Sequence, residues 1–153
     1  MSIESAEKVK VEIRPMEPED INAILEIDRK ISGVTRAVTY ADLIAGDLGG
    51  ELESSLVALV DDSVVGFILA RHVYLGYPVI KVALIQTVGV DPGYRRHKIA
   101  TRLINTLVKQ CRSKGPETIR VMVNERDSEL GKFFASMEFK RGQYIDYTMK
   151  LKR

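Results

Sequence analysis

The stretch Val88-Gly-Val-Asp-Pro-Gly-Tyr-Arg-Arg-His-Lys-Ile-Ala-Thr-Arg-Leu103 combines the end of a strand, a turn, a basic loop and the start of a helix. Apolar residues run to Val90, and the Asp-Pro-Gly sequence that follows is typical of a turn. The first turn of a helix presents unpaired N–H groups and the positive end of the helix dipole. Basic side chains directly precede this helix at Arg95, Arg96, His97 and Lys98. The stretch therefore predicts a site for phosphate groups at the start of the helix.

These residues resemble the acetyl-CoA pyrophosphate loop of the GNAT superfamily of N-acetyltransferases, which reads Gln/Arg-x-x-Gly-x-Gly/Ala. Arg95 takes the first place and Ala100 the last, while Lys98 stands where the family has its central glycine. Lys98 either adds charge to the phosphate site or crowds the backbone with its Cβ. The resemblance implies that acetyl-CoA is the cosubstrate and that the loop contacts it through Arg95, Arg96, His97, Lys98, Ile99, Ala100 and Thr101.

A second segment, 130–139, resembles the family's Ala-x-x-Leu/Phe-Tyr-x-x-x-Gly-Phe helix. Leu130 fills the alanine place, Phe134 the tyrosine place and Glu138 the glycine place. An asparagine often opens this helix in the family, and Asp127 stands there, where a carboxylate also suits an N-cap. By the resemblance we expect Asp127 and Phe134 to lie beside the acetyl-CoA.

Hydrophobic periodicity predicts strands alternating with helices along the whole chain. The predicted strands are 8–14, 56–60, 64–75, 79–90, 118–123 and a closing hairpin of 139–143 with 144–151; the predicted helices are 18–33, 40–45, 99–114 and 128–137. This order is that of an α/β protein. With the two motifs it implies a GNAT-like, mixed but mostly antiparallel sheet of six to seven strands, with about four helices on both faces. The closing hairpin offers an edge strand that a second copy could cover in a homodimer.

Composition bounds the other possibilities. The 153 residues suit one domain, expected at 9–153 after a polar, disordered segment 1–8. A net charge of +2 does not indicate a surface that binds nucleic acid. One cysteine and two histidines are too few to suggest a metal site. No apolar stretch is long enough to span a membrane, and the N-terminus lacks the apolar core of a signal peptide. We therefore expect a cytoplasmic protein.

The groups for catalysis are less clearly encoded. In the family, the fourth strand splays at a bulge and offers backbone N–H groups to the pantetheine and the thioester carbonyl. By register we expect Val88, Gly89 and Val90 to contact the cofactor in this way, although an ordinary buried strand fits equally well. The family often has a glutamate base on its fourth or fifth strand and a tyrosine acid on the short helix. This chain has Leu84, Met122 and Phe134 at those places, none of which can exchange a proton.

Three explanations remain open. Other residues supply the groups, with Tyr144 and Tyr147 as candidate acids, and with Gln86 or Glu125 positioning a water as base. Alternatively, orientation alone supplies most of the rate. In the third case the chain binds an acyl-CoA without turning it over.

The function that we expect is N-acetyl transfer from acetyl-CoA directly to a primary amine. A peptide or protein acceptor is favoured over an antibiotic or polyamine, because 141–149 resembles the tyrosine-bearing end of the branch that acetylates protein N-termini. By the same resemblance, 38–43 is expected where that branch contacts its peptide. The alternative is a non-catalytic acyl-CoA-binding sensor or regulatory domain.

Overall fold

The computed structural model describes residues 9–34 and 54–152. The chain divides into two compact units, a first unit of Met1–Met122 and a second unit of Val123–Arg153, and each is described by itself. The predicted disordered segment 1–8, the predicted helix 40–45 and the segment 38–43 that carries a family resemblance lie outside the described residues.

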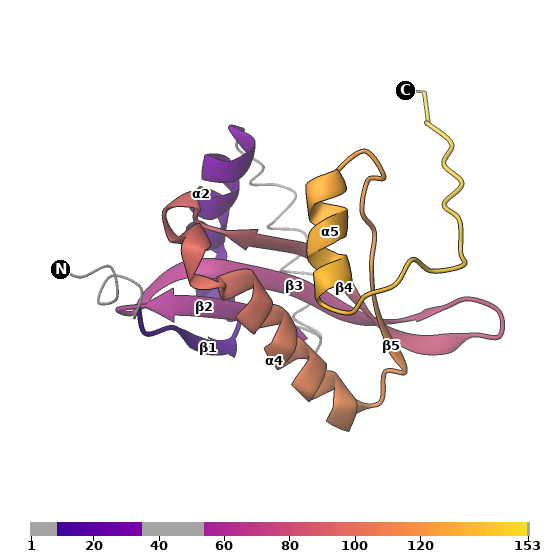
Figure 1. The fold of residues 1–153 in the computed structure, drawn as a ribbon, viewed down its shortest axis with the longest axis horizontal. Coiled ribbons are helices and arrows are strands. Elements are labelled where there is room, and N and C mark those ends of the chain that lie inside the picture. Colours follow the sequence, from indigo (N-terminus) through magenta and orange to yellow (C-terminus); the bar gives the residue numbers. More distant parts are fainter. Residues whose placement is uncertain (1–8, 35–53, 153) are drawn as a thin grey trace. The chain divides into compact units, whose positions relative to one another are not determined.

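The first unit is built on a five-stranded sheet in the order β1-β2-β3-β4-β5 (Figure 1). The strands are β1 (Glu12–Pro15), β2 (Leu56–Val60), β3 (Ser63–Leu75), β4 (Ile80–Val90) and β5 (Thr118–Val121). Neighbouring strands pair antiparallel except β4 and β5, which are parallel. The α/β class and the mostly antiparallel sheet are confirmed.

Two long helices of the first unit begin and end near their predicted bounds. A short 3-10 helix, η1 (Pro18–Asp20), leads into α2 (Ile21–Ser32), and α4 spans Ile99–Lys114. Each helix is followed by a glycine in the left-handed conformation, Gly33 with φ 80° and Gly115 with φ 104°. Glycine adopts this conformation without steric cost, which is why both ends could be predicted.

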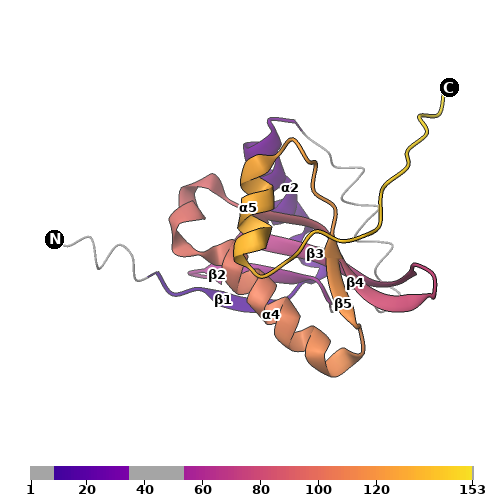
Figure 2. The ribbon, with the colours of Figure 1, turned by 45° about the vertical axis from the view of Figure 1, so that its right-hand side comes forward.

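The two helices cover opposite faces of the sheet. Phe67 and Leu69 of β3 belong to one buried cluster with Ile24 and other residues of α2. A Cβ added at Gly66 would lie 2.8 Å from Cγ2 of Ile99, on α4. Because side chains of a strand alternate between faces, α2 lies on the Phe67 face and α4 on the Gly66 face (Figure 2).

A β-bulge lies in β4, but not at the predicted place. Leu69 pairs with Thr87 and Ala70 with Ile85, so Gln86 is the extra residue. Of the two alternatives for Gly89, the bulge is wrong and the ordinary buried strand is confirmed, since Gly89 is buried and pairs in regular register with Phe67. A Cβ at Gly89 would lie 2.8 Å from Cε1 of Phe67, so the glycine makes room for a buried ring.

The second unit contains α5 (Ser128–Ser136) followed by an extended segment. Residues 139–152 form no strand, so the predicted closing hairpin of 139–143 and 144–151 is wrong, and the described sheet has five strands rather than six or seven. The edge strand predicted for a second copy is likewise not formed there. The alternation of apolar and polar residues gives this segment one apolar face, but a strand also needs a neighbour for its backbone hydrogen bonds.

Candidate functional site

One edge of β4 is open over its second half. Pairing with β5 runs from Val82–Thr118 to Ile85–Val121 and stops there, one residue before the bulge. Pairing with β3 on the other side continues to Val90. Within the described part of the first unit, β4 therefore has a strand on only one side from Gln86 to Val90.

The N–H groups of Val88 and Val90 point to this open edge. Asp91 N donates to Val65 O at 2.8 Å, which shows that the Asp91 N–H points towards β3. N–H groups along a strand point alternately to its two sides, so that of Gly89 also points towards β3 and those of its neighbours point away. An extended ligand with amide groups can bind to such an edge as an added strand would.

The open edge leads into a loop that is held firmly at its start. The loop is a 3-10 helix, η4 (Pro92–His97), capped by Asp91, whose Oδ1 accepts a hydrogen bond from Gly93 N at 2.9 Å. Oδ2 of Asp91 pairs with Nζ of Lys30, in the last turn of α2, at 2.9 Å. The hydrogen bond from Lys30, aided by the Gly93 N–H, holds the pKa of Asp91 below its usual value.

Lys98 joins the loop to α4 in a conformation that lysine rarely adopts. Its φ of 55° and ψ of 34° are left-handed, which explains why a glycine suits this place. The Lys98 carbonyl accepts a hydrogen bond from Arg102 N at 3.0 Å. The N–H groups of Ile99, Ala100 and Thr101 precede this bond and have no partner inside the helix. They form the donor end of α4.

The side chains around this helix end carry positive charge into solvent. Arg95, Arg96 and Lys98 are exposed, and His97 is half-buried with its ring centroid 6.2 Å from that of Tyr94. Ile99 is only 1% exposed and belongs to the core, so of the predicted contacts it can offer only its backbone. Exposed cations beside unpaired N–H groups suit an anion such as a phosphate.

Gln86 occupies the bulge and has an unsatisfied side-chain oxygen. Its Oε1 is buried and accepts no hydrogen bond. A buried acceptor without a donor costs about 1–3 kcal/mol. Because the bulge adjoins the open edge, a ligand at that edge could supply the missing donor. In the sequence, the polar pair Gln86-Thr87 interrupts an otherwise apolar strand, which is the signal that could have located the bulge.

The other candidate catalytic residues belong to the second unit. Tyr144 and Tyr147 are 54% and 91% exposed. Glu125 is exposed and lies 3.9 Å from the guanidinium of Arg141. Gln86 lies in the first unit and these three residues in the second. The catalytic roles of all four therefore stay predictions.

Two residues that the family motif places beside the cofactor have structural roles in the second unit. Asp127 caps α5, accepting a hydrogen bond from Leu130 N at 3.0 Å. Phe134 is 4% exposed, and its ring meets those of Phe133 and Phe139 edge-on with centroids 5.2 Å apart in each case. The predicted N-cap is thus confirmed, while contact with acetyl-CoA stays a prediction.

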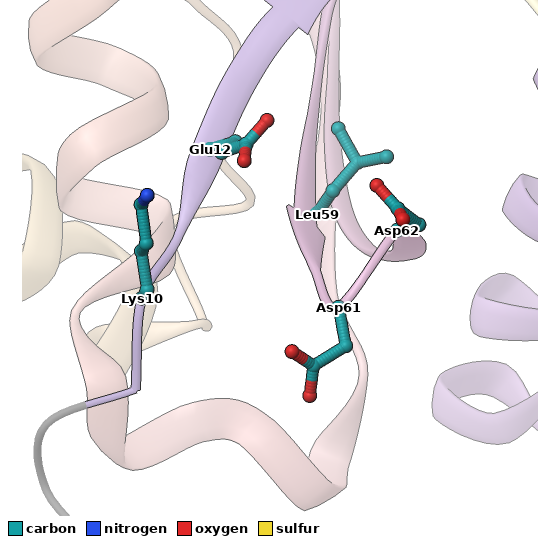
Figure 3. A pocket seen from close by; sticks show the side chains of 5 residues that line it. All are labelled: Lys10, Glu12, Leu59, Asp61 and Asp62. Atoms are coloured by element: carbon teal, nitrogen blue, oxygen red, sulfur yellow. The ribbon is translucent and has the colours of Figure 1, made fainter.

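A pocket of about 200 Å³ lies elsewhere, beside the β2–β3 turn (Figure 3). Its lining residues are Lys10, Glu12, Leu59, Asp61 and Asp62. The three carboxylates give it the same sign of charge as a phosphate, so it is not a phosphate site. In the described ranges, no cluster of histidine, cysteine or acidic side chains could hold a metal ion, and no helix is long and apolar enough to cross a bilayer.

Comparison with solved structures finds this fold in several acetyltransferases. A possible acetyltransferase from Clostridium difficile 630 superposes with a TM-score of 0.77 at 20% identity, covering 94% of this chain and 99% of that one. A ribosomal-protein-alanine N-acetyltransferase from Brucella melitensis biovar Abortus 2308 gives 0.74 at 14% identity, covering 93% and 100%. Aminoglycoside N-acetyltransferase AAC(6')-Iy, solved with CoA, gives 0.73 at 16% identity, covering 93% and 95%.

Comparison with curated proteins finds no match. The model of the acetyltransferase (GNAT) family, however, matches residues 21–139, a range that begins with α2 and includes the open edge of β4, the basic loop and α5. The chain therefore belongs to the GNAT family of acetyltransferases.

Proposed function

We propose that this protein transfers the acetyl group of acetyl-CoA directly to a primary amine of a peptide or protein. The observation that carries the proposal is the continuous path in the first unit from the open edge of β4, beginning at Gln86, to the donor end of α4. It offers, in order, a buried acceptor, two strand N–H groups, and a cluster of N–H groups with cations.

The parts of acetyl-CoA match this path in the same order. The pyrophosphate suits the N–H groups of residues 99–101 together with Arg95, Arg96 and Lys98. The amide groups of the pantetheine arm suit the N–H groups of Val88 and Val90. The thioester is then expected near Gln86, where β5 no longer covers β4.

The reaction needs little more than orientation. The amine lone pair attacks the thioester carbonyl carbon, a C–N bond forms, and the C–S bond breaks with its electron pair on sulfur. The amine gives up one proton and the thiolate gains one. Holding the two reactants together supplies most of the rate. Gln86 cannot take the proton, but its Oε1 can accept a hydrogen bond from the amine and orient the lone pair.

A peptide or protein acceptor is supported by the resemblance of 141–149 to the branch that acetylates protein N-termini. One protein of similar fold is a ribosomal-protein-alanine N-acetyltransferase, although others act on aminoglycosides. The CoA complex of one such protein supports an acyl-CoA cosubstrate.

A second candidate function is a non-catalytic acyl-CoA sensor. The observation in its favour is the lack of ionisable groups at Leu84, Met122 and Phe134, of which Phe134 is buried in an aromatic cluster. The sensor would use the same path for the ligand, but would not release CoA.

Calorimetric titration with acetyl-CoA, followed by a thiol-release assay with peptide and amine acceptors, separates these functions. Arg95→Ala should weaken acetyl-CoA binding about tenfold, since a charge-assisted contact is lost. Arg112→Ala is the matched control, because Arg112 is also exposed but lies in the last turn of α4. Binding without turnover would favour the sensor, and no binding by the unmodified protein would contradict both.

A further inference from the structure

Two arginines flank an apolar residue in one row across the middle of the sheet. Leu84 of β4 pairs with Arg71 of β3 on one side and with Arg120 of β5 on the other. Directly paired residues of neighbouring strands point to the same face. The side chains of Arg71, Leu84 and Arg120 therefore share one face of the sheet, and each is half-buried.

This face is the one that α2 covers. Along β3, Phe67, Leu69 and Arg71 follow one another at every second position, and the first two pack against α2. The donor end of α4 and the side chain of Ile99 belong to the opposite face, at Gly66. The row of arginines and the proposed phosphate site therefore lie on opposite faces of the sheet.

The row also lies close to the expected place of the thioester. Leu84 precedes Gln86 by two residues, which corresponds to about 7 Å along a strand. The β4–β5 pairing ends at Ile85, immediately after the row. With acetyl-CoA along the open edge and its phosphates at α4, the face that carries the arginines is the side from which an amine can reach the carbonyl.

We propose that the acceptor carries a carboxylate close to its amine, and that Arg71 and Arg120 bind this carboxylate. The inference rests on the proposed function and names its substrate class. Guanidinium groups bind carboxylates through two parallel N–H donors, and partial burial strengthens such contacts. The Cα atoms of the two arginines are about two strand spacings, or 10 Å, apart, so their long side chains can converge over Leu84.

Leu84 contributes to this selectivity in two ways. It adds no charge between the arginines, and it gives the aliphatic part of the acceptor an apolar surface. An acidic residue at the start of a peptide and a free acidic amino acid both present this chemistry. A neutral acceptor of the same shape lacks the charge-assisted hydrogen bonds to the arginines and should bind less tightly.

The test compares acceptors that differ in one charge. Two tetrapeptide amides, identical except for glutamate or glutamine as the first residue, are assayed for CoA release beside free glutamate. We expect kcat/KM to be about tenfold or more higher for the glutamate peptide, mainly through KM, since one charge-assisted contact typically contributes that much. A higher kcat/KM for free glutamate than for the glutamate peptide would indicate a small-molecule acceptor, and the reverse would indicate a peptide. Equal kcat/KM values for the two peptides would overturn the proposal.

Substitutions in the row then test whether the preference for the glutamate peptide depends on Arg71, Leu84 and Arg120. Arg71→Gln and Arg120→Gln should each reduce the preference for glutamate while leaving the Kd for acetyl-CoA unchanged, whereas Arg112→Gln should change neither. Leu84→Glu keeps both arginines but places a competing carboxylate between them, so it should abolish the preference for glutamate. It tests the proposal independently of whether the arginine variants fold. A preference that survives all three substitutions in the row would contradict the assignment.

Direct binding separates this inference from the proposed function. Calorimetry of the two peptides, with and without saturating CoA, measures the same preference when no turnover occurs. Selective binding of the glutamate peptide without CoA release would support the carboxylate-binding row and contradict the proposed acetyl transfer. Equal affinities would reject the site, whatever the outcome of the acetyl-CoA titration.

Discussion

Nζ of Lys30 lies 2.9 Å from Oδ2 of Asp91, so an ion pair links the last turn of α2 to the start of the basic loop. Asp91→Asn removes the charge but keeps an oxygen for the Gly93 N–H. The loop should then be held less firmly, and acetyl-CoA binding should weaken a few-fold, within the modest range of exposed ion pairs. Calorimetry measures the change, and Glu26→Gln, which breaks the exposed pair with Arg29 on the same helix, is the control.

The same pair predicts a pH dependence of stability. Lys30 holds the folded-state pKa of Asp91 below its ordinary value of 3.8. The contribution is therefore complete above about 3.8, the pKa expected of the unfolded chain, and is lost as the pH falls through the lower folded value. Urea unfolding should show the protein more stable than Asp91→Asn at pH 7, with the difference shrinking below pH 4. A difference that grew on acidification would contradict this sign.

Two substitutions at Lys98 separate the effect of its charge from the effect of its left-handed backbone on stability and on acetyl-CoA binding. Lys98→Gly and Lys98→Ala both remove the ammonium group, but only glycine adopts a φ of 55° without strain. The glycine variant should therefore be more stable than the alanine variant by about 1 kcal/mol, measured by urea unfolding.

The Kd for acetyl-CoA in these two variants then decides what Lys98 does. Equal weakening in both, reduced at high salt, would show that the charge binds phosphate. Tighter binding in Lys98→Gly alone would show that the Cβ crowds the loop. Tighter binding in both variants would contradict a favourable charge.

Gly66 sets how closely α4 approaches the sheet. A Cβ there would lie 2.8 Å from Cγ2 of Ile99 and 3.5 Å from Cδ1 of Leu103, both fully buried. Gly66→Ala should therefore reduce the free energy of unfolding by about 1–3 kcal/mol. It should also weaken acetyl-CoA binding, because the displaced Ile99 begins the proposed phosphate site. Gly131→Ala in α5 is the control: no atom lies within 4 Å, and alanine favours a helix by about 0.5–1 kcal/mol.

The sequence predicts those elements whose signals are local. The α4 bounds follow from the apolar spacing of Ile99, Leu103 and Leu107 and from Gly115, and the β2–β3 hairpin follows from Asp61-Asp62 between two apolar runs. The basic loop is equally local, since its charges and its helix start lie within ten residues. These parts of the fold could be predicted from the sequence, and the binding of phosphate by the loop stays a prediction.

Other features depend on partners that a single strand does not reveal. From the sequence, Gly89 fits a bulge and an ordinary strand position equally well, and only the structure shows that it accommodates the ring of Phe67 on the neighbouring strand. The alternation along 144–151 predicts a strand, but the segment forms none in the described part of the chain. The row of Arg71, Leu84 and Arg120 exists only through the pairing register of three strands, so no spacing in the sequence indicates it.

We expect the Gln86 side chain to lower the stability of the fold while it supports turnover. Its buried Oε1 has no hydrogen bond, so Gln86→Met, which keeps the volume and removes the polar group, should leave stability unchanged or raise it by about 1 kcal/mol. If Oε1 orients the amine, turnover should fall about tenfold or more, since one positioning hydrogen bond is lost. Thermal unfolding and CoA release measured on the same sample give both quantities.

Gln110 provides the matched control for this substitution. Its Oε1 is also buried without a partner, but it lies on α4, away from the open edge of β4. Gln110→Met should therefore resemble Gln86→Met in stability and keep full turnover. If both variants lost activity equally, the loss would come from general repacking. If neither did, the amine would be oriented by other groups, and the acceptor would have to be held by the arginine row alone.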